Sequence, residues 1–161
     1  MAEKDTLFDS KLKQVGLFDF KEFYSFLYDY LVGEGYNITE KVYNEKVGGD
    51  SRDLDIEWEV FKKISDYFKF TIKIKIKTLG MKSVEAEREG KKIKINQGTI
   101  EVKFKAILEK DYESKWENSP LMKFLRGIYD KYIIRERADQ YEEKLISDVN
   151  EIIAQCKAFL K

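Results

Sequence analysis

An apolar residue stands at every second position in three stretches of the chain, at 54–60, 68–76 and 100–108. Charged and polar residues fill most of the positions between them. A period of two places successive side chains on opposite faces of a β-strand, whereas a helix repeats at about 3.6 residues. The pattern therefore predicts three strands of one sheet, with a shared buried face that consists of Leu54, Ile56, Trp58, Val60, Phe68, Phe70, Ile72, Ile74, Ile76, Ile100, Val102, Phe104, Ala106 and Leu108.

The turn sequences near these stretches predict an antiparallel meander. Gly48-Gly49-Asp50-Ser51 and Glu89-Gly90-Lys91 suit hairpin turns, because glycine adopts the positive φ angles that tight turns require. A third turn is predicted near Ser65. The meander is expected to contain five to six strands, the remaining ones lying at 36–47, 84–88 and 92–95, and a short first strand at 11–15 is predicted before the first helix.

Helical periodicity appears on both sides of the strands. Asp19 and Glu22 have the spacing of a capping box, and apolar residues follow at helical intervals as far as Leu31. Ser119 before Pro120 is typical of a helix start, and an apolar face continues from there to Tyr132 and Ile133. The last segment has a narrow apolar stripe of Tyr141, Leu145, Val149, Ile152, Cys156 and Phe159.

These elements predict an α+β fold, because strands and helices occupy separate parts of the chain. We expect an N-terminal helix, an antiparallel β-meander of five to six strands and two C-terminal helices packed on the sheet. Residues 1–161 are expected to form a single α+β domain. Within it, residues 1–10 are predicted to be a flexible arm and residues 136–161 a long amphipathic helix.

The residue types that are missing argue against catalysis and metal binding. The chain has no histidine, the commonest general acid–base residue, and one cysteine. Because Cys156 lies on an apolar stripe, we interpret it as a buried hydrophobic residue rather than a nucleophile. The glycines at 48–49 lack the lysine and the following helix of a phosphate-binding loop. We therefore predict no catalytic residues, no cofactor, no metal and no enzyme activity, with Asp, Glu, Lys or Tyr chemistry as the alternative.

Charged residues alternate with the apolar ones in two of the predicted strands. Carboxylates on one strand could share a divalent cation, and a lysine row could hold nucleic acid. We favour cross-strand pairing of the two rows on the solvent face, with the aromatic rings turned inward and away from the lysines. The acidic row is Asp53, Asp55, Glu57 and Glu59, and the basic row is Lys69, Lys73, Lys75 and Lys77, extended by Lys82, Lys91, Lys92 and Lys94.

The overall charge balance gives the chain no strong global field. Lysine and arginine total 30, as do aspartate and glutamate, so nucleic-acid and membrane partners are predicted to be unlikely. The charged N-terminus, the lack of a long apolar stretch and the single cysteine predict a cytoplasmic location. Abundant lysine and glutamate without histidine favour a thermophilic, archaeal source.

The predicted order of elements resembles the helix-grip, or START-like, fold, in which a curved sheet wraps a long C-terminal helix around a hydrophobic cavity. This resemblance covers most of the chain as element order, and it implies a hydrophobic, lipid-like ligand. The residues that would line such a cavity, or else a solid core, are Tyr24, Tyr28, Trp58, Phe70, Phe104 and Tyr141.

Three function classes follow from these predictions. The leading hypothesis is a non-enzymatic interaction or structural module, whose partner is another protein or a second copy of the chain. A carrier of a hydrophobic small molecule is the alternative, and an enzyme without histidine chemistry comes third. Whether the space between the sheet and the last helix is filled or hollow distinguishes the first two classes.

Overall fold

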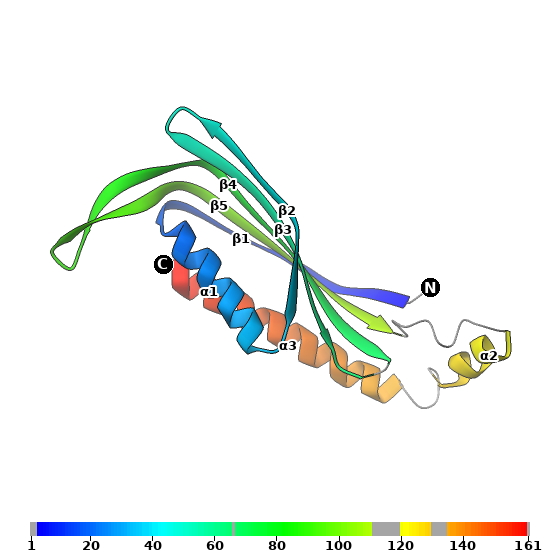
Figure 1. The fold of residues 1–161 in the computed structure, drawn as a ribbon. Helices are drawn as coiled ribbons and strands as arrows, with labels where there is room; N and C mark the ends of the chain where they lie inside the picture. The colour runs from blue at the N-terminus through cyan, green and yellow to red at the C-terminus, as the bar shows by residue number, and fades with distance from the viewer. Residues whose placement is uncertain (1–2, 66, 111–119, 130–134, 161) are drawn as a thin grey trace.

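A computed structural model describes residues 3–65, 67–110, 120–129 and 135–160. The elements, in chain order, are β1 (Glu3–Phe18), α1 (Phe20–Gly33), β2 (Asn37–Gly48), β3 (Ser51–Lys63), β4 (Phe68–Arg88), β5 (Lys91–Lys110), α2 (Pro120–Tyr129) and α3 (Arg135–Leu160). The strands form one five-stranded antiparallel sheet in the order β1-β5-β4-β3-β2 (Figure 1). The predicted α+β class and antiparallel sheet are thus confirmed.

One face of the sheet, which we call the inner face, is covered by α1 and α3 (Figure 1). Helix α3 packs along β1 and β5, and α1 contacts β2 and α3. Every residue predicted for the buried face of the three alternating strands is buried. Helix α3 adds Leu145, Val149, Ile152 and Cys156, each at most 2% exposed, so side chains fill the layer between the sheet and this helix.

The first part of the chain corrects two predictions. Residues 3–10, expected to be a flexible arm, belong together with 11–15 to the 16-residue strand β1, so the fold begins with a strand rather than with a helix. β1 pairs with β5 along its whole length. Its alternation is weak in the sequence because Ser10 and Gln14 occupy positions on the inner face, where Gln14 Nε2 donates to the carbonyl oxygen of Leu160.

The prediction that both C-terminal helices pack on the sheet is wrong for α2. Leu121 and Phe124 are each 65% exposed, Leu125 is 41% exposed and Ile128 is 39% exposed. α2 packs against none of the described strands and helices as α1 and α3 do, and it lies beyond the end at which α3 begins (Figure 1). α1 and α3 cover the inner face instead. The helical positions predicted at 130–134 lie outside the described residues.

A line of glycines crosses the sheet where β1, β5 and β4 meet. Gly16 of β1 is paired with Gly98 of β5. A Cβ atom on Gly98 would lie only 2.9 Å from Met81 Cα and 3.0 Å from the carbonyl oxygen of Gly80. β4 has a bulge at this level, and Gly80 has a φ of 59°. Bulges and glycines together let strands bend and approach closely, and the curvature of β4 and β5 is visible in Figure 1.

Beyond this line β4 and β5 continue as a two-stranded extension, Ser83–Arg88 and Lys91–Ile95, which we call the ribbon. Its strands pair only with each other, because β1 and β3 end before it. Glu89 and Gly90 at the tip have φ angles of 53° and 78°, which is the tight hairpin turn that the sequence predicts. The two short strands predicted on either side of this turn are therefore the distal ends of β4 and β5.

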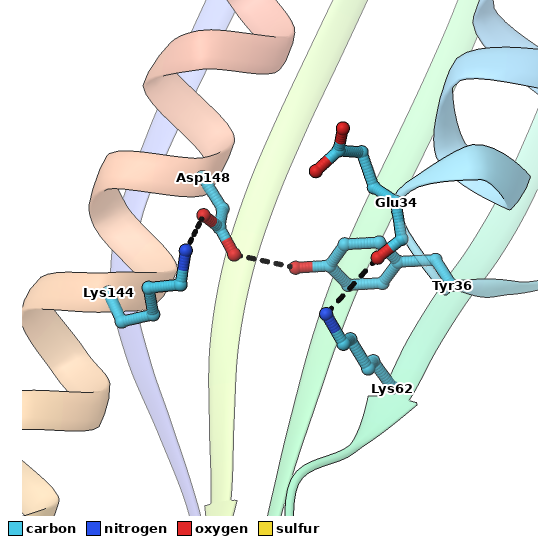
Figure 2. Close-up of polar contacts among 5 residues, drawn as sticks. All are labelled: Glu34, Tyr36, Lys62, Lys144 and Asp148. Carbon is cyan, nitrogen blue, oxygen red and sulfur yellow. Dashed lines mark hydrogen bonds and ion pairs between the residues drawn. The ribbon is translucent and has the colours of Figure 1, made fainter.

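A polar cluster joins α3 to the end of α1, and Figure 2 shows its five residues. The Tyr36 phenol donates to Asp148 Oδ2 at 3.4 Å, and Lys144 Nζ donates to Asp148 Oδ1 at 2.9 Å. Lys62 Nζ donates to the carbonyl oxygen of Glu34 at 3.1 Å and lies 5.4 Å from the centre of the Tyr36 ring. Burial, and then the charge of Asp148, raise the pKa of the Tyr36 phenol above its usual range, so this phenol stays a donor.

Candidate functional site

A groove of about 670 Å³ lies on the outer face of the sheet, opposite the helices, and all five strands contribute to its lining. Its charged residues are six lysines and three carboxylates, a net charge of +3 in a chain whose formal net charge is 0. The lysines are Lys11, Lys41, Lys73, Lys75, Lys103 and Lys105, and the carboxylates are Asp9, Glu57 and Glu59.

The register of the strands places lysine opposite lysine inside this groove. Lys103 of β5 is paired with Lys11 of β1 on one side and with Lys75 of β4 on the other. Lys105 is likewise opposite Lys73. We call these five residues the lysine cluster. Like charges directly opposite each other on adjacent strands destabilise a sheet, so the cluster lowers the stability of the free protein.

Carboxylates neutralise the lysine cluster only in part. Glu101 forms ion pairs with two lysines of the cluster: Lys11 Nζ lies 3.4 Å from its Oε2, and Lys103 Nζ lies 3.7 Å from its Oε1. Partial desolvation of Glu101 acts in the opposite direction, but the hydrogen bond and charge of Lys11 lower the pKa of this carboxyl. Lys73 and Lys105 form no ion pair with the carboxylates that the structure describes. Positive charge therefore remains available to a ligand.

The acidic row of β3 faces the lysines of β4, as predicted from the alternation. Glu57 Oε1 lies 3.5 Å from Lys75 Nζ, which is a cross-strand ion pair. Within the described ranges, no three Asp, Glu, Cys or His side chains are placed to hold one metal ion. Complementary pairs also occur on β5 and β1, for example Asp9↔Lys105 and Lys77↔Glu101, but the row Lys11–Lys103–Lys75 departs from this pattern. The paired positions of β3 and β4 are Asp55↔Lys77, Glu57↔Lys75 and Glu59↔Lys73.

Three of the predicted site residues meet under α1. The ring centres of Tyr24 and Tyr28 lie 5.1 Å and 6.0 Å from that of Trp58, both edge-on. Glu40 Oε2 accepts hydrogen bonds from the Tyr24 phenol at 2.6 Å and from Trp58 Nε1 at 2.9 Å. Burial first, and the contact with Glu40 second, raise the pKa of the Tyr24 phenol above its usual range. The phenol therefore stays protonated near neutral pH and acts as a hydrogen-bond donor that orients the Glu40 carboxylate, not as a general base.

The other three predicted site residues do not join this cluster. Phe70 and Phe104 are each 1% exposed on the inner face. Tyr141 of α3 is half-buried, with its ring centre 4.9 Å from that of Phe68 and 6.2 Å from that of Phe70. Phe104 and Trp58 also border the floor of the outer groove, although their side chains are buried. Tyr28 is 44% exposed, and the other predicted site residues are buried or half-buried.

A second cavity, of about 680 Å³, lies between the ribbon and the C-terminal end of α3, and we call it the ribbon cleft. Phe159, predicted to lie on the buried stripe of α3, is 37% exposed here, while Leu160 is buried instead. The charged residues of the cleft are Asp19, Glu22, Glu87 and Arg88, a net charge of −2. Its apolar residues are Leu17, Phe18, Ala86, Ile93, Ile95, Phe159 and Leu160.

Cys156 is fully buried, and burial raises the pKa of its thiol to about 12. We expect a thiol reagent at pH 8 to leave the folded protein unmodified and to react fully after unfolding in urea. The ordinary thiol pKa is about 8.5. The unfolded chain therefore loses this proton before the folded chain does, and the contribution of Cys156 to stability decreases as the pH rises from about 8.5 to about 12.

The control for this expectation is Cys156→Ala, whose unfolding free energy lacks the cysteine contribution to the pH dependence above about 8.5. Complete labelling of the folded wild-type protein at pH 8 would contradict the assignment of Cys156 as a buried, unreactive thiol.

Comparisons with protein-family models, with curated proteins and with solved structures find no significant match. Among the helices that the structure describes, none combines the length and the apolar character needed to cross a membrane. The function is therefore argued from the geometry of the two cavities.

Proposed function

We propose that this chain is a non-enzymatic binding protein that holds a compact, phosphate-bearing ligand in the groove on the outer face of its sheet. The observation that carries the proposal is the row Lys11–Lys103–Lys75, in which one sign of charge occupies opposed positions on three adjacent strands. The same sheet pairs opposite charges between β3 and β4. Local departures from such rules, which reduce stability, are expected where a protein binds a ligand.

The chemistry of the groove favours phosphate among anionic ligands. Lysine binds phosphate as a compact charge with three hydrogen-bond donors. Each phosphate group carries a charge of about −1.5 to −2 at pH 7, so two such groups would balance the net charge of +3 in the groove. The ligand is therefore proposed to be a small oligophosphate or a molecule that carries one.

Two other polyanionic partners, single-stranded nucleic acid and an anionic membrane, fit this groove less well. Single-stranded nucleic acid needs exposed aromatic rings for base stacking, whereas Phe70 and Phe104 are buried on the inner face. A membrane surface is flat, whereas this site is hollow and formed by five strands. Nucleic acid and membrane thus remain the less favoured partners, in agreement with the balanced charge of the chain.

The proposal keeps the non-enzymatic character of the leading hypothesis but replaces its protein partner by a small anionic ligand, and it assumes a cytoplasmic location, where phosphorylated metabolites are abundant. A carrier of helix-grip type would need space between the sheet and α3. The described side chains of that layer, among them Ile72, Val149 and Ile152, are packed at 2% exposure or less, so we do not favour a hydrophobic ligand there. An enzyme without histidine chemistry gains no support from the groove, because none of the described residues that line it is a buried acid or base.

Replacing Lys103 by glutamate is expected to stabilise the free protein and to weaken ligand binding. A carboxylate between Lys11 and Lys75 turns two repulsive cross-strand pairs into attractive ones, each worth about 0.2–1 kcal/mol. Part of this gain is offset because the ion pair of Lys103 with Glu101 is lost. Thermal melts with increasing inorganic tripolyphosphate measure both effects: the wild-type Tm should rise with the anion, and Lys103→Glu should bind it about tenfold more weakly.

The matched control is Lys82→Glu, which makes the same change in net charge on the adjacent strand β4. Lys82 is exposed, lies outside the groove and is opposite the neutral residues Ser51 and Gln97. Its tripolyphosphate titration should resemble that of the wild type. Equal weakening in the two variants, or no response of the wild-type Tm, would contradict a site at the lysine cluster. Tighter binding of a single-stranded oligonucleotide than of tripolyphosphate would contradict a compact ligand.

A further inference from the structure

Helix α2 presents an apolar surface that no described element covers. Leu121, Phe124, Leu125 and Ile128 follow one another at steps of three, one and three residues, so they share one face of the helix. They are 39–65% exposed. Apolar anchors with this spacing are typical of a helix that binds in a groove of a partner. The sequence of the segment contains two basic residues and no acidic residue.

The ribbon cleft offers the complementary surface at the other end of the molecule. Seven of its eleven lining residues are apolar, among them Leu17, which is 49% exposed, and Phe159, which is 37% exposed. Its charged residues have a net charge of −2, opposite in sign to the charge of the α2 segment. A volume of about 680 Å³ lies within the usual range for clefts that bind a ligand. Within the described part of the chain, the apolar face of α2 thus has no covering element, and the cleft carries charge of the opposite sign to the α2 segment.

The two surfaces of one molecule are too far apart to meet. The cleft lies at Phe159 and Leu160, at the end of α3. α2 precedes the start of α3, which has 26 residues and is therefore roughly 39 Å long at 1.5 Å per residue. The five residues 130–134 span at most roughly 18 Å when fully extended, and the ten residues of α2 add roughly 15 Å. The sum is smaller than the length of α3, and α2 lies beyond the start of α3, away from the cleft of its own molecule (Figure 1).

We propose that copies of this protein associate head to tail, with α2 of one copy bound by its apolar face in the ribbon cleft of the next. The contact joins two different surfaces, so it builds rings or open chains when each copy engages a new neighbour, and a two-fold dimer when two copies engage each other in both directions. The interaction uses neither the outer groove nor the lysine cluster, and it is independent of the proposed phosphate site.

The test uses two variants that each disable one half of the interface. Phe124→Glu places a negative charge on α2 that faces the acidic cleft, and Leu17→Lys places a positive charge in the cleft that faces the basic helix. Both positions are about half exposed or more, so the folded monomer should tolerate both changes. In light scattering coupled to size-exclusion chromatography, the wild-type mass should increase with protein concentration, and each variant alone should have the monomer mass.

Mixing the two variants provides the decisive measurement. Phe124→Glu retains an intact cleft and Leu17→Lys retains an intact α2, so one contact can form between them and no second one. The mixture is expected to give a 1:1 dimer, with twice the monomer mass, that does not grow with concentration. Val47→Lys, at a 69% exposed position on β2 outside both surfaces, is the control and should associate as the wild type does.

Several results would overturn the proposal. A wild-type protein that stays monomeric at the highest attainable concentration has no such contact. Continued association of either variant alone would point to a different interface, and a mixture that stays monomeric would exclude α2 binding in the cleft. Binding of the monomeric wild type to vesicles of anionic lipid, lost in Phe124→Glu, would assign the apolar face of α2 to a membrane instead.

Discussion

A chain that ends at Gln140 is expected to show no cooperative thermal unfolding transition. This truncation removes six buried residues of α3: Leu145, Val149, Ile152, Ile153, Cys156 and Leu160. Burial of a large apolar side chain contributes about 1.5–3 kcal/mol, while a typical domain has a total stability of about 5–15 kcal/mol. The loss of α3 also uncovers the inner face of β1 and β5. Circular dichroism during heating measures the result.

A pair of adjacent substitutions serves as the control for this truncation. Val149→Asp introduces a charge at a fully buried position of α3, whereas Asn150→Asp introduces the same side chain at the next, exposed position. The first should lower the free energy of unfolding by several kcal/mol, and the second should change it by less than about 0.5 kcal/mol. A truncated protein with an unchanged cooperative melt would show that the sheet and α1 fold without α3.

Replacing Gly98 by alanine is expected to lower the Tm by several degrees. The added Cβ would lie 2.9 Å from Met81 Cα and 3.0 Å from the carbonyl oxygens of Gly80 and Leu79. All three are backbone atoms of the neighbouring strand, so relief requires movement of β4 rather than rotation of a side chain. Overpacking of this kind costs about 1–3 kcal/mol, and in a chain of this size each kcal/mol shifts the Tm by about 2–4 °C.

The matched control is Gly48→Ala at the end of β2. No atom lies within 4 Å of the Cβ that this substitution adds, and its backbone has no positive φ. Its Tm should stay close to that of the wild type. Equal melting temperatures for the two variants would show that β4 and β5 adjust at the glycine line without cost.

The sequence predicted the buried face of the sheet well, for a local reason. Along β3, Leu54 to Val60 alternate so regularly with carboxylates that a register error of one residue would bury every charge. β1 lacked this signal, since Ser10, Gln14 and Gly16 interrupt the apolar positions. Its pairing with β5, about ninety residues later in the chain, depends on tertiary contacts that no local pattern reports.

The outer groove could not be predicted for a related reason. Each lysine was visible in the sequence, but the expected hairpin of β3 and β4 placed Lys73, Lys75 and Lys77 opposite acids only. The residues opposite these lysines on their other side belong to β5, and the residues beyond those belong to β1. Which residues these are depends on the register of β5 on β4 and of β1 on β5. The alternation of Lys11 and Lys13 with Phe8 and Leu12 was the available signal, although it was too short to distinguish a strand from an arm.

For helix α2, the sequence identified an apolar face but not the surface that covers it. Its apolar face was predicted to pack on the sheet, since Leu121, Phe124, Leu125 and Ile128 lie at helical spacing. Periodicity identifies the face but does not identify what covers it. In the structure α1 and α3, rather than α2, cover the inner face of the sheet.

The ribbon gives the two cavities different dynamic properties. Its backbone hydrogen bonds join β4 and β5 only to each other beyond the glycine line, so it can separate from the body of the protein without breaking any pairing of β1 or β3. Proteins open in contiguous units, each with a smaller free energy than that of global unfolding. The wall of the ribbon cleft is such a unit, whereas the groove lies across all five strands and opens only when the whole sheet does. The ribbon cleft is therefore expected to open by a local unfolding equilibrium of the ribbon, whereas the outer groove is lost only in global unfolding of the sheet.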